Sequence, residues 1–167
     1  MHRVLILAAI AATLIVAGCG GSNSTSSGTP ASAATSNTIG VKQVDGVGKV
    51  LVDTSGMALY TPDQEAKGMI QCTGSCVAIW KPVTPAGKPT AAAGAGTVGV
   101  VKRPDGSRQV TLDGMPLYSF VQDSASQITG DGAKDQFGGK SFTWHVVLAG
   151  GAKGTGMASK TSSQYGY

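Results

Sequence analysis

Residues that carry catalytic chemistry are scarce in this sequence of 167 residues. It contains two histidines and three cysteines, and His145 is the only histidine outside residues 1–18, which are considered below. A hydrolase triad needs a base in contact with a nucleophile and an orienting acid, and no nucleophile motif accompanies His145. The sequence therefore predicts that the protein is not an enzyme.

Clusters of like charge are also missing. Lysine and arginine outnumber aspartate and glutamate by 13 − 9 = 4. The basic residues are spread along the predicted domain, as Lys42, Lys49, Lys67, Lys81, Lys88, Lys102, Arg103 and Arg108. Scattered charges are typical of a solvated surface, whereas phosphate binding needs a basic patch or stripe. We therefore expect no nucleic-acid partner.

Segments long enough to form a crossover helix are absent from residues 41–148. Parallel strands require connections of a dozen or more residues, so a parallel α/β sheet is excluded. Only the segment from Cys76 to Trp80 has the composition of a helical turn. Short apolar stretches between loops rich in glycine and proline predict a mainly β fold with long loops.

The chain begins with an export signal over residues 1–18. Arg3 supplies a positive charge, and residues 4–16 form an apolar run that is too short to span a membrane comfortably, which is typical of a signal peptide. The junction Val16-Ala17-Gly18-Cys19 resembles the lipobox of bacterial lipoproteins. This resemblance implies cleavage before Cys19, lipidation of its thiol with acyl chains such as palmitate, and anchoring at the extracytoplasmic face of the cell membrane.

Segments of low complexity flank the region that can bury a core. Residues 20–38 are nearly all Gly, Ser, Thr, Asn, Ala and Pro and carry no charge, so the segment 19–40 is predicted to be a flexible tether behind the lipid. Residues 149–167 have a similar composition and predict a flexible C-terminal tail. The folded domain is therefore expected over residues 41–148.

Two stretches of the predicted domain repeat one another. Gly56-Met57-Ala58-Leu59-Tyr60 recurs as Gly114-Met115-Pro116-Leu117-Tyr118, and each copy follows an alternating apolar stretch and an acidic turn residue. Asp113-Gly114 between β-formers is a preferred two-residue hairpin turn, because both positions need a positive φ. We therefore predict two related β-hairpin repeats, residues 41–83 and 97–148, packed as one small domain.

A tryptophan follows each predicted hairpin, with a valine three positions later. Trp80 is followed by Val83, and Trp144 is followed by Val147. Two short hairpins alone would bury too little surface to be stable. Each large ring is therefore expected to fill the core and to cover its own hairpin.

A longer motif lies in the second repeat, where Tyr118-Ser119-Phe120-Val121-Gln122-Asp123 has the pattern Tyr-x-Phe-x-x-Asp. Together with Cys72-Thr73-Gly74-Ser75-Cys76 and Trp144-His145-Val146-Val147, it resembles the bacterial secreted-repeat lipoproteins that carry a Tyr-x-[aromatic]-x-x-Asp motif. The resemblance implies a small extracytoplasmic repeat domain and assigns it no biochemical role. The first repeat departs from the motif, because Tyr60 is followed by Pro62 at the aromatic position and by Glu65 at the acidic position.

The motif residues have two interpretations. In one, Tyr118, Phe120 and Asp123 form a ligand-binding face, and Tyr60 and Glu65 form a second one with altered geometry. In the other, which we favour, Tyr118 and Phe120 point to one side of a strand and Asp123 caps the following turn.

Cys72 and Cys76 form the clearest chemical pair in the sequence. In an exported protein, two cysteines on either side of Gly74 favour a local disulfide that shapes the turn before Trp80. A redox-active pair and a soft-metal site are the alternatives, although Cys-x-x-x-Cys is not the thioredoxin spacing.

Weak candidates for metal ligands are spread over the predicted domain. Met57, Met69 and Met115 carry thioethers that suit copper, but methionines at matched repeat positions more often fill gaps in a core. His145 is either a ligand or a partly exposed residue on the outer face of a strand. The acidic loop from Asp123 to Asp135 invites a calcium interpretation but departs from the EF-hand pattern. No cofactor is expected, and the identity of any metal is left open.

Together these features predict a membrane-anchored extracytoplasmic lipoprotein that acts as a non-enzymatic binding or structural module of the cell envelope. The sequence does not specify its partner, which is expected to be an envelope protein or a small ligand. The alternative function is redox chemistry or the handling of copper or zinc through Cys72 and Cys76.

Overall fold

The computed structural model describes residues 38–154 of the chain, and most of their regular structure consists of β-strands. The prediction of a mainly β fold is confirmed. Within these residues the elements are β1 (Gly40–Val44), β2 (Gly48–Val52), β3 (Tyr60–Pro62), the 3-10 turn η1 (Asp63–Glu65), α1 (Cys76–Ile79), β4 (Trp80–Pro82), β5 (Val98–Lys102), β6 (Arg108–Leu112), β7 (Met115–Pro116), β8 (Tyr118–Phe120), β9 (Lys134–Phe137) and β10 (Lys140–Val146). The helical turn α1 lies in the segment for which the sequence predicted one.

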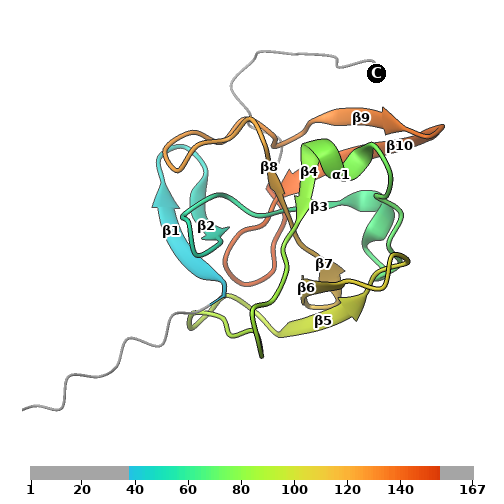
Figure 1. The fold of residues 1–167 in the computed structure, drawn as a ribbon. Helices are drawn as coiled ribbons and strands as arrows, with labels where there is room; N and C mark the ends of the chain where they lie inside the picture. The colour runs from blue at the N-terminus through green and yellow to red at the C-terminus, as the bar shows by residue number, and fades with distance from the viewer. Residues whose placement is uncertain (1–37, 155–167) are drawn as a thin grey trace, which may run out of the picture. The chain divides into compact units, whose positions relative to one another are not determined.

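The strands of the described residues form antiparallel sheets. A central sheet has the strand order β4-β8-β3-β10-β9, and two smaller sheets contain β1-β2 and β5-β6-β7. In Figure 1 the strands β3, β4 and β8 cross the middle of the domain, with β1 in cyan to one side and β5 in yellow below them. Backbone hydrogen bonds join the sheets, since Leu51 N donates to Val147 O at 2.9 Å and Val110 N donates to Val83 O at 2.8 Å.

Hairpins form where the sequence has its tight turns. Asp113 and Gly114 join β6 to β7, and their φ angles are 49° and 82°. A two-residue turn of this kind needs both angles to be positive, which explains the Asp-Gly pair. The first of the two similar segments is residues 41–83, and the second is residues 97–148. The corresponding loop of the first segment is longer, and the Asp53 carboxylate stabilises it by accepting hydrogen bonds from Ser55 N at 2.8 Å and Met57 N at 3.0 Å.

The two similar segments exchange strands at the centre of the domain. β4 of the first segment pairs with β8 of the second, in a register that places Trp80 opposite Phe120. β10 of the second segment pairs with β3 of the first, in a register that places Trp144 opposite Pro62. β3 and β8 pair with each other at the tyrosine that begins each strand. In the central sheet, each segment therefore contributes a strand that pairs with a strand of the other segment.

Stacked aromatic rings fill the core beside this sheet. Trp80 and Trp144 are both fully buried, and the centroids of their rings are 3.9 Å apart. Phe120 stacks on Trp80 with centroids 4.3 Å apart, and Phe142 lies 5.7 Å from Trp144. We expected each tryptophan to cover its own hairpin. The two rings instead stack on each other, because the exchanged strands β4 and β10 bring them together.

The packed structure extends past the domain limits that the sequence suggested at residues 41 and 148. Ile39 is fully buried, and its N–H donates to Thr90 O at 3.0 Å. At the other end, Gly154 N donates to Val146 O at 2.8 Å. A few residues of the predicted tether and tail are therefore part of the fold.

Several predictions concern residues outside the described range. They are the signal peptide over residues 1–18, the lipidated Cys19, the tether before residue 38 and the tail after residue 154. Between residues 38 and 154, no helix is both long and apolar enough to cross a membrane.

Candidate functional site

Glu65, the acid of the first motif, lies in the core rather than at the surface. It ends the η1 turn, its side chain is fully buried, and the Tyr118 hydroxyl donates to its Oε2 at 2.6 Å. Its Oε1 accepts backbone hydrogen bonds from Gln71 N at 2.5 Å and Cys72 N at 2.6 Å. Burial, together with the nearby charge of Glu65, raises the pKa of Tyr118 well above its ordinary value. Glu65 thus holds the tyrosine of the second motif and the backbone that leads into the cysteine pair.

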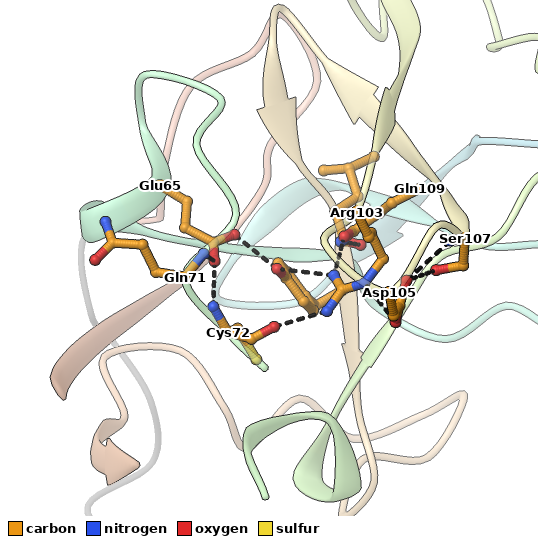
Figure 2. A network of polar contacts seen from close by, with 9 residues as sticks. Glu65, Gln71, Cys72, Arg103, Asp105, Ser107 and Gln109 are labelled. Atoms are coloured by element: carbon orange, nitrogen blue, oxygen red, sulfur yellow. Dashed lines mark hydrogen bonds and ion pairs between the residues drawn. The ribbon is translucent and has the colours of Figure 1, made fainter. Parts of the chain in front are cut away.

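Arg103 supplies a positive charge beside this buried acid, as Figure 2 shows. Its side chain is 2% exposed, and its guanidinium donates to Cys72 O at 2.7 Å and to Gln109 Oε1. The same group lies 3.4 Å from the Tyr118 hydroxyl, and its Nε is 3.6 Å from Asp105 Oδ2. A buried charge is tolerated only where it is paired and hydrogen-bonded, and this network meets that requirement.

Asp123, the acid of the second motif, makes the reciprocal contact. The Tyr60 hydroxyl donates to Asp123 Oδ2 at 2.5 Å, and Asp123 Oδ1 accepts from Thr129 N and Oγ1, both at 2.8 Å. The Tyr60 oxygen also accepts from Gly130 N at 3.3 Å. A Cβ at Gly130 would lie 2.8 Å from Trp80 Cη2, so this close approach requires glycine. Desolvation raises the pKa of Asp123, and burial with that carboxylate raises the pKa of Tyr60.

The two motifs therefore hold each other in place. Each tyrosine donates to the acid of the other motif, and each acid also accepts a backbone N–H from the residue six positions later. The aromatic rings of Tyr118 and Phe120 are buried, while the acid after the strand closes the following loop. This arrangement gives the motif a role in assembling the domain.

The segment that carries the complete motif also matches a known family model. Residues 99–147 match the family model of a secreted repeat of unknown function. The resemblance to secreted repeats is confirmed for this segment, and it is consistent with an extracytoplasmic module. Searches of curated proteins and of solved structures gave no match.

The matched segment lacks two of the hydrogen-bond partners of its own motif. Tyr118 and Asp123 lie inside the matched residues, whereas Glu65 and Tyr60, to which they are hydrogen-bonded, lie in the preceding segment. The structure thus couples the secreted repeat to the residues before it.

Replacing Tyr60 by phenylalanine is expected to lower the free energy of unfolding by about 1 to 3 kcal/mol. The ring stays in the core, but Asp123 Oδ2 and Gly130 N lose their common partner. Urea denaturation monitored by tryptophan fluorescence measures the change. The control is Ser141→Ala at an exposed strand position, with an expected effect below about 0.5 kcal/mol. Equal stability of Tyr60→Phe and the wild type would contradict the reciprocal contact.

Cys72 and Cys76 form a disulfide in the structure, with sulfur atoms 1.97 Å apart, and both residues are fully buried. The backbone of Cys72 is held on both sides, because its N–H donates to Glu65 and its carbonyl accepts from Arg103. Cys76 begins α1, which leads directly into Trp80, so the disulfide shapes the turn that places the tryptophan in the core.

His145 lies on β10 beside an acidic side chain of η1. Its Nε2 is 3.1 Å from Asp63 Oδ2, and Lys153 Nζ donates to Asp63 Oδ1 at 2.7 Å. The bond from Lys153, followed by that from His145, lowers the pKa of Asp63. Thr61 lies opposite His145, and within residues 38–154 neither its hydroxyl nor His145 Nδ1 has a hydrogen-bond partner. The Asp63 side chain is 47% exposed, so these contacts contribute little stability.

The weak metal candidates Met57, Met115 and His145 lie on separate elements: the loop after β2, strand β7 and strand β10. In the described part of the chain, no three His, Cys, Asp or Glu side chains form a group that could hold a metal ion. In the acidic loop, Asp135 accepts the Trp80 indole N–H at 2.7 Å.

A groove of about 310 Å³ opens between the β1-β2 hairpin and the loop that follows the second motif. Its floor is apolar and includes Val52, Ala58 and Ile128. Lys42 and Asp45 lie at its polar margin, and the Lys42 ammonium donates to a backbone carbonyl of the loop, Ala125 O. The sequence did not indicate this groove.

Sequence reasoning also missed Arg103 and Gln109. Arg103 was counted among the solvated charges, but it is buried, whereas Arg108 of the same hairpin is exposed. The local pattern does not separate the two arginines, because the Cys72 carbonyl that accepts a hydrogen bond from Arg103 comes from the first segment. Gln109 has no local signal either, because alternation with Val110 and Leu112 assigns it to the polar face of the strand, whereas β6 is buried on both faces.

Proposed function

We propose that the protein is a lipid-anchored, non-enzymatic module of the cell envelope that presents a rigid β domain for binding on the extracytoplasmic side. The match of residues 99–147 to a secreted repeat supports the extracytoplasmic location. The sequence Val16-Ala17-Gly18-Cys19 supports cleavage and lipidation at Cys19. The uncharged segment that follows it supports a tether between membrane and domain.

The observation that carries the non-enzymatic role is the engagement of the motif's polar groups. Tyr60 and Tyr118 donate to Asp123 and Glu65, so the hydroxyls and carboxylates of both motifs are used within the domain. A general acid or base must reach a substrate proton, and the fully buried Glu65 has no such access. The motif therefore serves to build the domain, and the exposed surface is left for binding.

The redox or metal-handling alternative places its chemistry at Cys72 and Cys76. Thiol exchange and metal coordination both require an accessible thiolate. Both residues are fully buried and joined to each other, which favours a structural bridge.

The anchor is tested by expressing the full chain and a Cys19→Ala variant in a bacterium with a lipoprotein pathway. The wild type is expected in the membrane fraction, with an intact mass that corresponds to cleavage before Cys19 and addition of acyl chains. Cys19→Ala is expected to lack the mass of the acyl chains and the cleavage before residue 19, because the acylated residue is gone. Unlipidated wild-type protein in the soluble fraction would refute the anchor.

A matched control and a second readout use the same material. The double variant Cys72→Ala/Cys76→Ala keeps Cys19, so it is expected to stay with the membrane. Intact mass and metal analysis of the wild type are expected to give a bridged pair without stoichiometric metal. Free thiols or stoichiometric copper or zinc would instead favour the redox or metal-handling alternative.

A further inference from the structure

The groove beside the β1-β2 hairpin corresponds to a site that is filled in the second segment. Val44 is the last residue of β1, and its carbonyl accepts Val47 N at 3.1 Å in the hairpin turn. Arg103 directly follows β5, and its carbonyl accepts Gly106 N at 3.0 Å in the same way. Val44 and Arg103 therefore occupy corresponding positions before the turns of the two hairpins.

Leu51 and Val110 also occupy corresponding positions in the two hairpins. Leu51 N bonds to the carbonyl of Val147, and Val110 N bonds to the carbonyl of Val83, which are the valines that follow the two tryptophans. The residue before Leu51 is a valine, whereas the residue before Val110 is Gln109. The polar pair of arginine and glutamine in the second hairpin is thus a pair of valines in the first.

Because valine is smaller than arginine, space is left beside a loop at the first hairpin, whereas the Arg103 side chain fills the corresponding space at the second. In the second segment, the Arg103 side chain extends from its hairpin to Cys72 O, beside the loop that Glu65 closes (Figure 2). In the first segment, the shorter Val44 lines the groove beside the loop that Asp123 closes. The groove is therefore the counterpart of the Arg103 site without its guanidinium.

The charges around the groove suit a cation on an aliphatic stem. Asp45 is exposed at the margin, and within residues 38–154 its carboxylate takes part in no hydrogen bond or ion pair. Asp123 lies behind the loop, and its partners Tyr60 and Thr129 are neutral. The Lys42 ammonium is directed to Ala125 O. An apolar floor and a free carboxylate at the rim match the stem and head of an arginine, which buries its methylenes and keeps its charge near water.

We propose that this groove binds an arginine side chain presented by another polypeptide, in the position that Arg103 occupies in the second segment. The guanidinium pairs with Asp45, and its stem covers Val52 and Ile128. The inference rests on the proposed binding role and names the chemistry of the partner, but it does not depend on the lipid on Cys19.

The test titrates the full lipidated chain, labelled with nitrogen-15 in detergent micelles, with Nα-acetyl-arginine N-methylamide. The matched probe is the citrulline analogue, which has the same shape and no charge. We expect saturable shifts of backbone amides in residues 42–45 and 124–128, with a dissociation constant on the order of 1 mM for so small a ligand. The citrulline probe is expected to bind about fivefold more weakly, because it lacks the charge that pairs with Asp45.

Three variants separate the groove from non-specific binding. Val44→Arg places a guanidinium in the groove from within the chain, so the response to the arginine probe is expected to disappear. The Asp45→Asn variant is expected to bind the arginine and citrulline probes with nearly equal affinity. Val100→Arg adds the same charge at an exposed position of β5 and is expected to leave the response unchanged.

Three outcomes would overturn the inference: no shifts in the groove, equal affinity for both probes, or wild-type affinity in a folded Asp45→Asn variant. None of these outcomes would contradict the proposed lipid-anchored module, because lipidation and the presence of the protein in the membrane fraction are measured in a separate experiment. Loss of the anchor, conversely, leaves the arginine titration unaffected.

Discussion

Replacing Arg103 by methionine is expected to lower the free energy of unfolding by about 3 to 5 kcal/mol. Methionine fills much of the space of the arginine stem, so the loss comes mainly from electrostatics and hydrogen bonding. The Tyr118 hydroxyl that donates to the buried Glu65 loses its contact with the guanidinium, and the carbonyl of Cys72 and the amide oxygen of Gln109 lose their donor. Removing one partner of a buried charged network leaves the others desolvated and unpaired.

Urea denaturation with linear extrapolation measures this loss, since a domain of this size has a total stability of about 5 to 15 kcal/mol. Arg108→Met on the same hairpin is the control, because Arg108 is exposed, and it is expected to change stability by less than about 0.5 kcal/mol. Adding Glu65→Gln to Arg103→Met is expected to restore part of the loss, because the uncompensated charge is removed. A loss below about 1 kcal/mol for Arg103→Met would mean that the network contributes little.

The features that the sequence predicted are local ones. The Asp113-Gly114 turn follows from the φ angles of two adjacent residues, and the helical turn at Cys76 follows from a short stretch of chain. Burial of Trp80 and Trp144 follows from their size. The pairing of β4 with β8 and of β10 with β3 could not be predicted in this way, because an alternating pattern places residues on a face without naming the neighbouring strand.

In the candidate site, too, the local features were predicted from the sequence and the long-range contacts were not. The aromatic residues Tyr118 and Phe120 were placed on one strand face, and Asp123 was expected to close the turn after it, as it does at Thr129. The contact between the Tyr118 hydroxyl and Glu65 could not be predicted, because the two residues lie 53 positions apart in the sequence. Arg103 also makes a long-range contact, with Cys72 O, and so its burial was missed for the same physical reason.

The exchange of strands makes a strong prediction about the two halves of the chain. Residues 38–87 and residues 88–154, produced as separate fragments, are expected to lack a folded core. The first fragment retains β4 without β8, and the second retains β10 without β3. Fragments of this size also bury too small a fraction of their surface to be stable without help.

Mixing the two fragments in equal amounts is expected to restore the fold. The cut lies between Gly87 and Lys88, which are both exposed, so it removes no strand pairing or core contact from the assembled domain. Near-ultraviolet circular dichroism measures the recovery, because the stacked rings of Trp80 and Trp144 come from different fragments. Each fragment alone is expected to give a weak signal and no cooperative transition.

A variant of the second fragment distinguishes specific assembly from aggregation. Trp144→Ser removes the ring that stacks on Trp80 and is expected to abolish recovery, whereas Ser141→Ala at an exposed position of the same strand is expected to preserve it. Cooperative unfolding of residues 88–154 alone would instead mean that the segment matched as a secreted repeat is a complete folding unit. The hydrogen bonds from Tyr118 to Glu65 and from Tyr60 to Asp123 argue against that outcome, because each half of the chain holds one donor and one acceptor of the reciprocal pair.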